Sequence, residues 1–292
     1  MTFNLVYLYL LAPLHTGGTS QEGNLVGIAR ESHTDLPYVP SSTIRGRQRA
    51  ATNPTERIKL WGNTIDDLKS NDDSSVNLAD LPPPAADTSA KITNLIQGAL
   101  WVGDASILWM PVPSLSHGVI WVSCPLLLQR WGRLSGHLTS VPQYSTNLGN
   151  SKPVYLKDAI LKASDLRAWK ETDWHPFIPE ARRSDIQRLL VLPDQHCATL
   201  IQMSLWRQVK VRLDEHKTVK DGFRYEEAIP PDTLMYFPWG TTQANKTAQE
   251  ASDSFGALIQ ANPIAQIGGQ ESLGRGFVQQ WDNGSANGGR QA

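Results

Sequence analysis

FNLVYLYLLAPLHTGGTSQEGNLVGIARE, residues Phe3 to Glu31, is the stretch from which the fold prediction starts. Its first part, up to Leu11, is rich in aromatic and aliphatic side chains, which predicts a strand buried on both faces. From Leu14 onward, His15 is followed by glycines and polar residues, so we expect a loop there and neither helix interior nor regular strand. Such a loop either carries chemistry, holds a ligand or only turns the chain.

The bulk composition is that of an ordinary globular chain without an overall basic field. Of the 292 residues, 40% are hydrophobic and 19% are charged, and the formal net charge is -1. A nucleic-acid-binding function would therefore depend on local basic patches. The ten tryptophans are the compositional oddity. We expect them to be core and interface anchors more than base-stacking platforms.

The cysteines and the N-terminal apolar run bear on whether the protein has zinc sites, disulfides or a membrane-spanning segment. Cys124 and Cys197 show no CxxC spacing, so we expect neither a structural zinc site nor a disulfide framework, and a reducing cytoplasm is the expected compartment. The apolar run before His15 is far shorter than the ~20 residues of a membrane-spanning helix, and it lacks a basic segment and a cleavage site. HExxH, P-loop and EF-hand patterns are absent from the sequence, so no pre-formed metal site is expected.

Strands and helices alternate along the rest of the chain, which predicts an α+β protein. Extended structure is expected over 26–40, followed by a helix with Ser41 or Ser42 as its N-cap. The apolar run at 98–113 predicts a strand, with a turn or bulge at Gly103–Asp104.

Further elements follow from periodicity and from glycine and proline breaks. They are a strand at 119–123 leading into a short helix, irregular structure at 143–173, helices at 184–190 and 194–203, a strand at 233–239, a helix at 246–261, and a strand, glycine loop and strand over 264–281. The Asp-, Ser- and Pro-rich stretch at 66–90 predicts a solvated or disordered insertion, and residues 283–292 a flexible tail.

The clearest hairpin pattern lies at about 208–228. Val209, Val211 and Leu213 alternate with Lys210 and Arg212, and a charged turn and a returning strand follow. Alternation of this kind predicts two antiparallel strands with one apolar face.

Three stretches have residues suited to chemistry or ligand binding. His15 is a candidate general base or metal ligand, and it is equally the kind of histidine that ends a strand and bonds to backbone. No GxSxG motif is present, and neither cysteine has a neighbouring base motif, so nucleophilic catalysis is not indicated.

The second stretch, SSTIRGRQR, places three hydroxyl residues at a helix start, ahead of arginines on one helical face. Free N–H groups and guanidinium groups there favour a phosphate, although a solvated basic face fits the residues as well. The third stretch, IGGQESLGRGFV, is no dinucleotide fingerprint. Its glycines allow close approach of a ligand to the backbone, and Arg275 is a candidate phosphate contact.

Five stretches occur together in the order found in one family. They are HTGG (15–18), ARESHTDLPYVPSSTIRG (29–46), VGDASILWMPVPSLSHGVIWVSCPLLLQRW (102–131), YEEAIPPDTLMYF (225–237) and IGGQESLGRGFV (267–278). With them the chain resembles the RAMP-superfamily backbone subunit of type III-B CRISPR effector complexes, the fourth subunit of the Cmr module in the seventh Cas protein group. The matches run from the first strand to Val278. The acidic insertion, part of the middle and the tail are left out.

This resemblance implies one ferredoxin-like (RRM-like) domain over 1–282, with an antiparallel sheet core, inserted loops and a protruding thumb hairpin at 208–228. It implies that copies stack head to tail along a guide CRISPR RNA, and that the thumb wedges between guide and target RNA. The large Cas subunit and the small subunits of the effector are the other implied partners. Recognition through the RNA backbone would need no sequence-reading motif.

The resemblance also assigns RNA contacts to the helix start, the thumb and the glycine loop. The residues concerned are Ser41, Ser42, Thr43, Arg45, Arg49, Lys217, Lys220, Gly268, Gly269, Gly274, Arg275 and Gly276.

Members of the family cut bound target RNA with an Asp in the loop after the His-Gly motif, assisted by a divalent metal. Their stretch resembles GVVDxPIQRE, whereas this chain reads GNLVGIARE at 23–31, one residue shorter and without the acid. Glu22 is the nearest carboxylate before it, and His15, Glu226 and Glu227 are further candidates. We therefore expect no stably bound cofactor, and Mg²⁺ or Mn²⁺ only where target cleavage is retained.

Three functions remain open from the sequence. The leading hypothesis is a guide-RNA-binding scaffold, and the alternative is a target-RNA endoribonuclease that uses a substitute acid. A guide-processing nuclease with His15 as general base is the third, which the backbone-type blocks disfavour.

Overall fold

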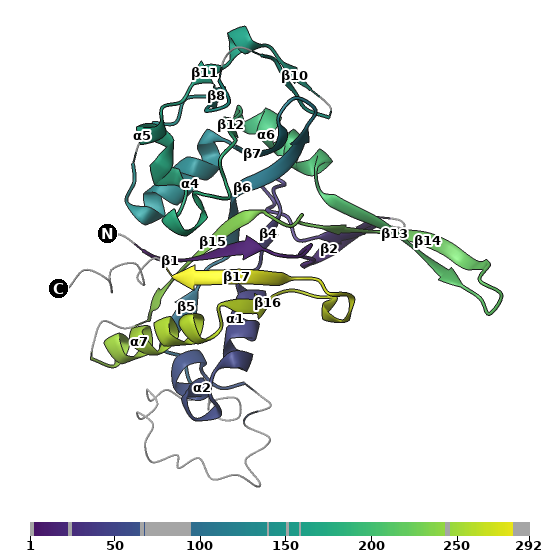
Figure 1. Ribbon diagram of the computed structural model, residues 1–292. Helices are drawn as coiled ribbons and strands as arrows, with labels where there is room; N and C mark the ends of the chain where they lie inside the picture. The colour runs from purple at the N-terminus through teal and green to yellow at the C-terminus, as the bar shows by residue number, and fades with distance from the viewer. Residues whose placement is uncertain are drawn as a thin grey trace.

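The computed structural model describes residues 3–22, 25–64, 67, 95–138, 140–149, 152–157, 159–242 and 246–282 (Figure 1). Apart from Asp67, the predicted insertion at 66–90 lies outside these residues, as does the predicted tail at 283–292. The described chain is a mixed α+β structure, as predicted, and its largest sheet has eleven strands among these residues.

Four antiparallel strands form the middle of this sheet. β1 (Asn4–Leu10) pairs with β15 (Leu234–Thr241) on one side and with β17 (Phe277–Asp282) on the other, and β6 (Ala105–Ser114) pairs with β15. In the chain, α1 (Ser41–Ala51) lies between β1 and β6, and α7 (Lys246–Ala261) lies between β15 and β17. The spatial order of these strands is therefore β6-β15-β1-β17.

β1 is buried on both faces, as the sequence predicted, and its alternating side chains enter two cores. Val6, Leu8 and Leu10 pack with Ile44 of α1 and Phe255 of α7 in one apolar cluster. The opposite side chains, Leu5, Tyr7 and Tyr9, belong to a second cluster with Trp109, Trp131, Trp169 and Phe177. Seven of the ten tryptophans are buried (Trp61, Trp109, Trp121, Trp131, Trp169, Trp174 and Trp239), which confirms their expected role as core anchors.

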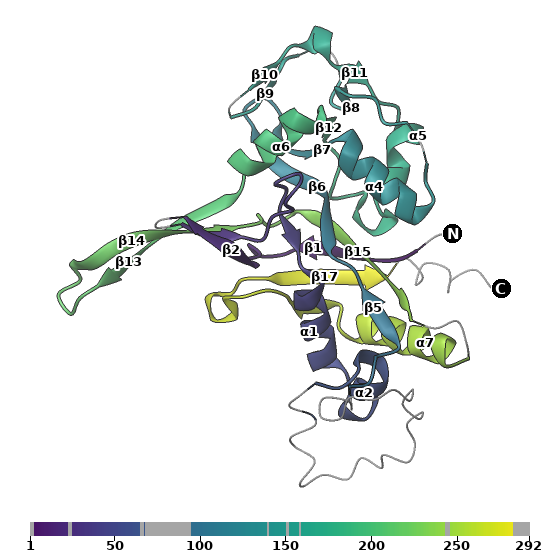
Figure 2. The same ribbon diagram turned by 180° about the vertical axis from the view of Figure 1, so that it is seen from behind.

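Helices cover both sides of the central strands. α1, α2 (Pro54–Trp61) and α7 gather on one side, and α4 (Pro125–Ser135), α5 (Glu171–Trp174) and α6 (Asp194–Met203) on the other (Figures 1 and 2). The outer strands of the sheet are β4 (Tyr38–Val39), β5 (Leu100–Val102), β7 (Gly118–Ser123), β8 (Ser145–Thr146), β11 (Arg167–Ala168), β12 (Leu189–Val191) and β16 (Ile264–Gln266). A separate pair is formed by β9 (Val154–Tyr155) and β10 (Ile160–Leu161). None of the described helices is long and apolar enough to cross a membrane.

The predicted hairpin is present and projects far from the rest of the molecule (Figures 1 and 2). β13 (Trp206–Leu213) and β14 (Val219–Ala228) pair antiparallel, and we call residues 206–228 the arm. β14 also pairs in parallel with β3 (Leu25–Ile28), which pairs antiparallel with β2 (Gly17–Glu22). The arm thus belongs to a second, four-stranded sheet of order β13-β14-β3-β2.

Tertiary pairing overrides several local predictions. The helix predicted at 184–190 is wrong, because Leu189, Leu190 and Val191 form the fully buried strand β12, parallel to β7. The expectation that no regular strand follows His15 is also wrong, because Gly17–Glu22 pairs with β3, with a register shift between Gly17 and Gln21. The sheet as a whole is mixed, since β12–β7 and β11–β8 pair in parallel outside the four antiparallel central strands.

The stretch predicted to be irregular, 143–173, contains the two-residue strands β8 to β11, and the predicted cap of α1 is also wrong. This helix begins at Ser41 and has no side-chain cap, so neither Ser41 nor Ser42 fills the predicted role. The strands on either side of Gly103–Asp104, the strand and helix around Cys124, the helix Asp194–Met203, and the helix and strands of the C-terminal part are confirmed.

Candidate nucleic-acid interface

The loop between β16 and β17, residues 267–276, is fixed against the histidine that follows β1. Gly269 N donates to His15 O at 2.9 Å, and Gly276 N donates to Pro13 O at 2.9 Å. Gly268 has φ +85°, and a Cβ there would lie 2.4 Å from His15 O. Gly276 has φ +76°, and a Cβ there would lie 2.0 Å from Ile267 O. These two glycines are therefore needed for close packing on the body, whereas Gly269 and Gly274 are exposed.

His15 links this loop to the arm. Its side chain is buried, and ring Nδ1 lies 2.8 Å from the carbonyl oxygen of Glu227. A carbonyl only accepts, so Nδ1 is the protonated nitrogen in this contact. His15 is thus bonded to backbone, one of the two roles that the sequence left open.

Glu226 is a fully buried carboxylate surrounded by three cations. Its oxygens lie 2.7 Å from Lys210 Nζ, 3.0 Å from Arg224 Nη2 and 3.0 Å from Arg275 Nη1. Burial raises the pKa of Glu226, but Lys210, Arg275 and Arg224 outweigh it and hold that pKa below its ordinary value. The carboxylate is therefore ionised at neutral pH and already neutralised by protein groups.

Arg275 reaches this carboxylate from the glycine loop and is itself buried, with only 4% of its side chain exposed. Its Nη2 donates to Gln208 Oε1 at 3.0 Å, and its Nη1 donates to Gln270 Oε1. The guanidinium carbon also lies 4.5 Å from the ring centroid of Trp206. Arg275 was predicted to contact RNA directly, and the structure directs its guanidinium to protein groups.

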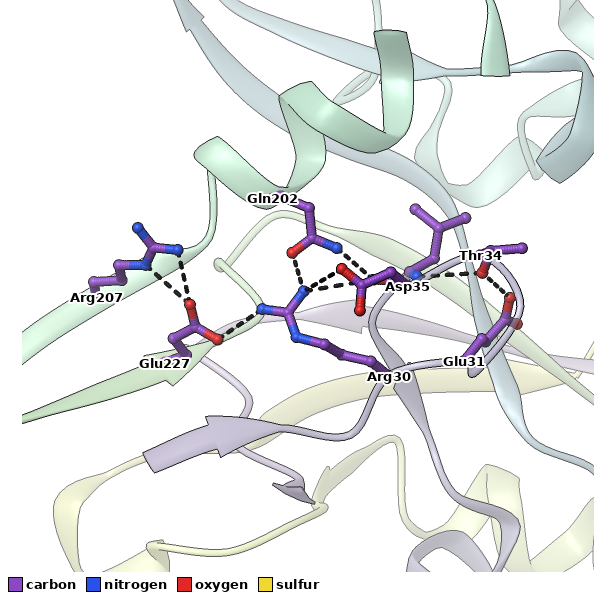
Figure 3. A network of polar contacts seen from close by, with 8 residues as sticks. Arg30, Glu31, Thr34, Asp35, Gln202, Arg207 and Glu227 are labelled. Carbon is purple, nitrogen blue, oxygen red and sulfur yellow. Dashed lines mark hydrogen bonds and ion pairs between the residues drawn. The ribbon is translucent and has the colours of Figure 1, made fainter. Parts of the chain in front are cut away.

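Glu227, the next residue, is buried between two further arginines (Figure 3). Arg207 Nε and Arg30 Nη2 donate to its oxygens at 2.9 and 2.8 Å. Arg30 also donates to Gln202 of α6 and lies 3.7 Å from the exposed carboxylate of Asp35. The network thus joins the arm, β3 and α6.

The arm presents one apolar face and one charged face. Cross-strand partners Val209–Tyr225, Val211–Phe223 and Leu213–Val219 lie on one face, and each of these side chains is 41–61% exposed. Lys217 and Lys220, predicted to contact RNA, are exposed near the turn. An uncovered apolar face of this size usually marks a binding surface.

The start of α1 differs from the phosphate site predicted there. Ser41 N donates to Asp104 Oδ1 at 2.6 Å, so a carboxylate already occupies this helix end. Arg45 donates to Trp61 O, and Arg49 donates to Gly62 O at 3.2 Å and to Asp67. Ser42 is exposed and Thr43 is partly buried.

Sequence reasoning missed Lys210 and Arg224 as shared partners of Glu226. Their signal was the hairpin register, because Lys210 lies opposite Arg224 and Gln208 lies opposite Glu226. Arg30 was missed altogether, since its partners are 172 and 197 residues away in the chain.

The candidate acids are unevenly described. Glu22 is the last residue of β2, and its backbone pairs with Leu25, but its side chain lies outside what the structure describes. Glu31 forms an ion pair with Arg130, in which Glu31 Oε1 lies 2.5 Å from Arg130 Nη1. Among the residues that the structure describes, no three His, Cys, Asp or Glu side chains group as metal ligands.

The fold and the loop that packs on the His-Gly motif define a RAMP-type protein. The chain belongs to the RAMP superfamily, whose family model matches residues 7–279. It is 27% identical over 300 residues to the CRISPR system Cmr endoribonuclease Cmr4 of Pyrococcus furiosus, covering 94% of this chain and 93% of that one. The family resemblance seen in the sequence is confirmed.

Solved structures agree. A crystal structure of oligomeric Cmr4 from Pyrococcus furiosus has a TM-score of 0.65 at 23% identity, with 97% of this chain and 98% of that chain covered. A chain of the type III-B Cmr-beta complex bound to cognate target RNA has a TM-score of 0.68 at 19% identity, with 97% of each covered. At these identities the structures establish the shared fold.

Proposed function

We propose that this chain is a guide-RNA-binding backbone subunit of a type III-B CRISPR ribonucleoprotein. The observation that carries the proposal is the excess of positive charge at the arm root, by which we mean residues 206–210 and 224–228 together with the ion-paired residues Arg30, Asp35 and Arg275. Within the described part of the chain, the cations Lys210, Arg224, Arg275, Arg207 and Arg30 form their ion pairs with Glu226, Glu227 and Asp35. Five cations against three carboxylates leave a local charge of +2 in a chain whose net charge is -1.

This excess suits a phosphodiester backbone. Arg224 and Arg207 are 60% and 54% exposed, so their guanidinium groups have donors available to a ligand. The two buried carboxylates hold the cations in place before RNA arrives, and the ordering cost of binding is thereby reduced. Phosphate contacts of this kind position an RNA without reading its sequence.

The architecture supports the same function. The strand order β6-β15-β1-β17, with α1 and α7 in the connections, supports the assignment of a ferredoxin-like core. We assign the arm as the thumb of the family, and its exposed apolar face as the surface that separates guide from target. Further copies of the chain, target RNA, and the large and small effector subunits are the proposed partners, in a cytoplasmic particle.

The binding proposal is tested by replacing Lys210 and Arg224, two cations that belong to the arm itself, so that the rest of the molecule keeps its ion pairs. The double variant Lys210→Gln/Arg224→Gln should bind a labelled single-stranded guide RNA about tenfold more weakly, and its salt slope should be smaller by roughly 0.7 for each phosphate that is no longer neutralised. The matched control is Lys152→Gln/Arg188→Gln, which removes two exposed cations outside the arm and changes the net charge by the same amount. Equal effects of the two pairs would mean that only net charge matters, and would refute a site at the arm root.

A target-RNA endoribonuclease is the alternative, and one observation favours keeping it. Glu22 pairs with Leu25, and Leu25 pairs with Tyr225 of the arm, so the Glu22 backbone lies two strands away from the arm root. The assembled complex is given guide RNA, complementary labelled RNA and Mg²⁺ or Mn²⁺. Cuts at regular spacing that disappear with Glu22→Ala would establish cleavage by this chain. Intact target would leave the scaffold function.

A further inference from the structure

The arm has few connections that could fix its direction. It leaves the body after α6 and returns at Ala228. Among the described residues, β14 pairs with β3 at Tyr225–Leu25 and Glu226–Val26, and Glu227 contacts His15 and Arg30. Beyond this point the side chains on its apolar face are about half exposed. An isolated two-stranded hairpin is marginally stable in water and has no preferred direction of its own. The direction seen in Figures 1 and 2 must therefore be imposed at the arm root.

Arg275 is the residue that spans from the body to both strands of the arm. It contacts Trp206 and Gln208 on β13, and Glu226 on β14. Its own backbone is held in the body, because Arg275 O accepts from Gln266 Nε2 at 3.3 Å and the next residue, Gly276, donates to Pro13 O. One side chain thus ties the C-terminal loop to a hairpin some 50 to 70 residues earlier in the sequence.

We propose that Arg275 is a positioning residue that sets the direction of the arm relative to the central sheet. The planar guanidinium is suited to this role, since one face lies on Trp206 while donors in its plane reach Gln208, Gln270 and Glu226. The glycines on either side serve the same end, because they let the loop pack closely enough on residues 13–15 to bring Arg275 to the root. The role does not depend on RNA, so it stands or falls separately from the proposed function.

The direct test measures the distance between the arm and the body. Spin labels are placed at Glu215→Cys near the turn of the arm and at Gln260→Cys on α7, both exposed, while the two native cysteines are buried. Pulsed electron resonance on the full chain then gives a distance distribution. With Arg275→Met we expect that distribution to be roughly twice as broad, because the short pairing with β3 and the contacts of Glu227 with His15 and Arg30 hold β14 alone. Arg275→Lys should be intermediate, since an ammonium group keeps the charge and loses the fork.

Arg224→Met is the matched control. It removes one cation from the same carboxylate, but Arg224 is on the arm itself and its ion pair with Glu226 stays within the arm. Its distribution should stay as narrow as that of the unchanged chain. An unchanged width in Arg275→Met, or equal broadening in Arg224→Met, would overturn the proposal.

Trp206→Leu removes the stacked ring from the arm side while leaving Arg275 in place, and it covers the case in which Arg275→Met fails to fold. Broadening in Trp206→Leu supports the positioning role, and an unchanged width counts against it. A direct RNA contact by Arg275 is a separate outcome, and it would overturn the positioning role. It would appear as weaker RNA binding in Arg275→Met with no change in the width of the distribution.

Discussion

The start of α1 was predicted from the sequence to bind RNA phosphates, the arm root is proposed to do so from the structure, and the basic residues of these two regions are used in different ways. At α1, Arg45 and Arg49 donate to backbone carbonyls and to Asp67, and Asp104 takes the first N–H of the helix. At the arm root, five cations share two buried carboxylates and one exposed one. A run of arginines in the sequence therefore gives the number of charges, while the fold decides how many remain available to a ligand.

The largest effect is expected from removing the carboxylate that holds the root together. Glu226→Ala leaves Lys210, Arg224 and Arg275 facing one another without their shared anion, and Arg275 stays buried. Breaking a buried ion pair on one side costs about 3–5 kcal/mol. Urea unfolding followed by tryptophan fluorescence should show that loss.

Arg49→Ala provides the comparison at α1, where each basic group has its own partner. It should cost much less than Glu226→Ala. Comparable losses of unfolding free energy in the two variants would mean that the ion pairs stabilise the arm root no more than they stabilise α1. The contrast between the two regions would then be refuted.

The elements with strong local patterns were predictable from the sequence, and the site was predictable only in part. Alternation placed the arm, and aromatic and aliphatic runs placed β1, because these signals act within a few residues. The helix expected at 184–190 failed because its apolar side chains are buried in a strand beside β7, a pairing that no local window contains. Glycine spacing located the loop that packs on His15, but its partner residues lie more than 200 positions away.

The same limit applies to Arg275. In IGGQESLGRGFV, Arg275 looks like a phosphate ligand because glycines surround it, and only the fold reveals that Glu226 and Trp206 lie within its reach. Asp104 likewise has no local mark as the acceptor for the α1 N-terminus, since 63 residues separate it from Ser41.

A second prediction uses pH and concerns Glu31, whose carboxylate pairs with Arg130 and lies 3.8 Å from His33 Nε2. Burial raises the pKa of Glu31, but hydrogen bonds from Arg130 and Thr34 and the charge of Arg130 outweigh it, so the folded-state pKa is lowered from 4.5. A lowered folded pKa means that the stabilisation is fully present above the unfolded pKa and is lost as pH falls through the folded value.

The unchanged chain should therefore lose unfolding free energy as pH falls below 4.5. Glu31→Gln should already be less stable at pH 7, because a charged hydrogen bond is worth about 1.5–3 kcal/mol. Its stability should fall less steeply in acid, which chemical unfolding at pH 7, 5 and 3.5 will measure. Parallel pH curves for the two chains would show that the Glu31–Arg130 pair contributes nothing.

A third prediction separates structural from ligand-binding arginines. Arg45→Ala should lower the free energy of unfolding by about 1–2 kcal/mol, because it leaves the Trp61 carbonyl at the end of α2 without its donor. The salt slope of guide-RNA binding should stay unchanged, whereas Arg224→Gln should lower that slope and leave stability nearly the same. A lower slope in Arg45→Ala would mean that α1 binds RNA as the sequence first suggested.

The smallest effects are expected at the N-termini of α1 and α2, which are capped by a distant carboxylate and by a local asparagine, respectively. Asp104→Ala removes the acceptor of the Ser41 N–H and should cost about 1 kcal/mol, the usual loss for a cap. Asn53→Ala should cost about the same at α2, where Asn53 Oδ1 accepts from Thr55 N at 3.2 Å. Ser41→Ala should change stability by under about 0.5 kcal/mol, since no side-chain cap is removed there. Thermal unfolding of the three variants measures the set. If Ser41→Ala were as damaging as Asp104→Ala, the serine would act as the cap that the sequence predicted.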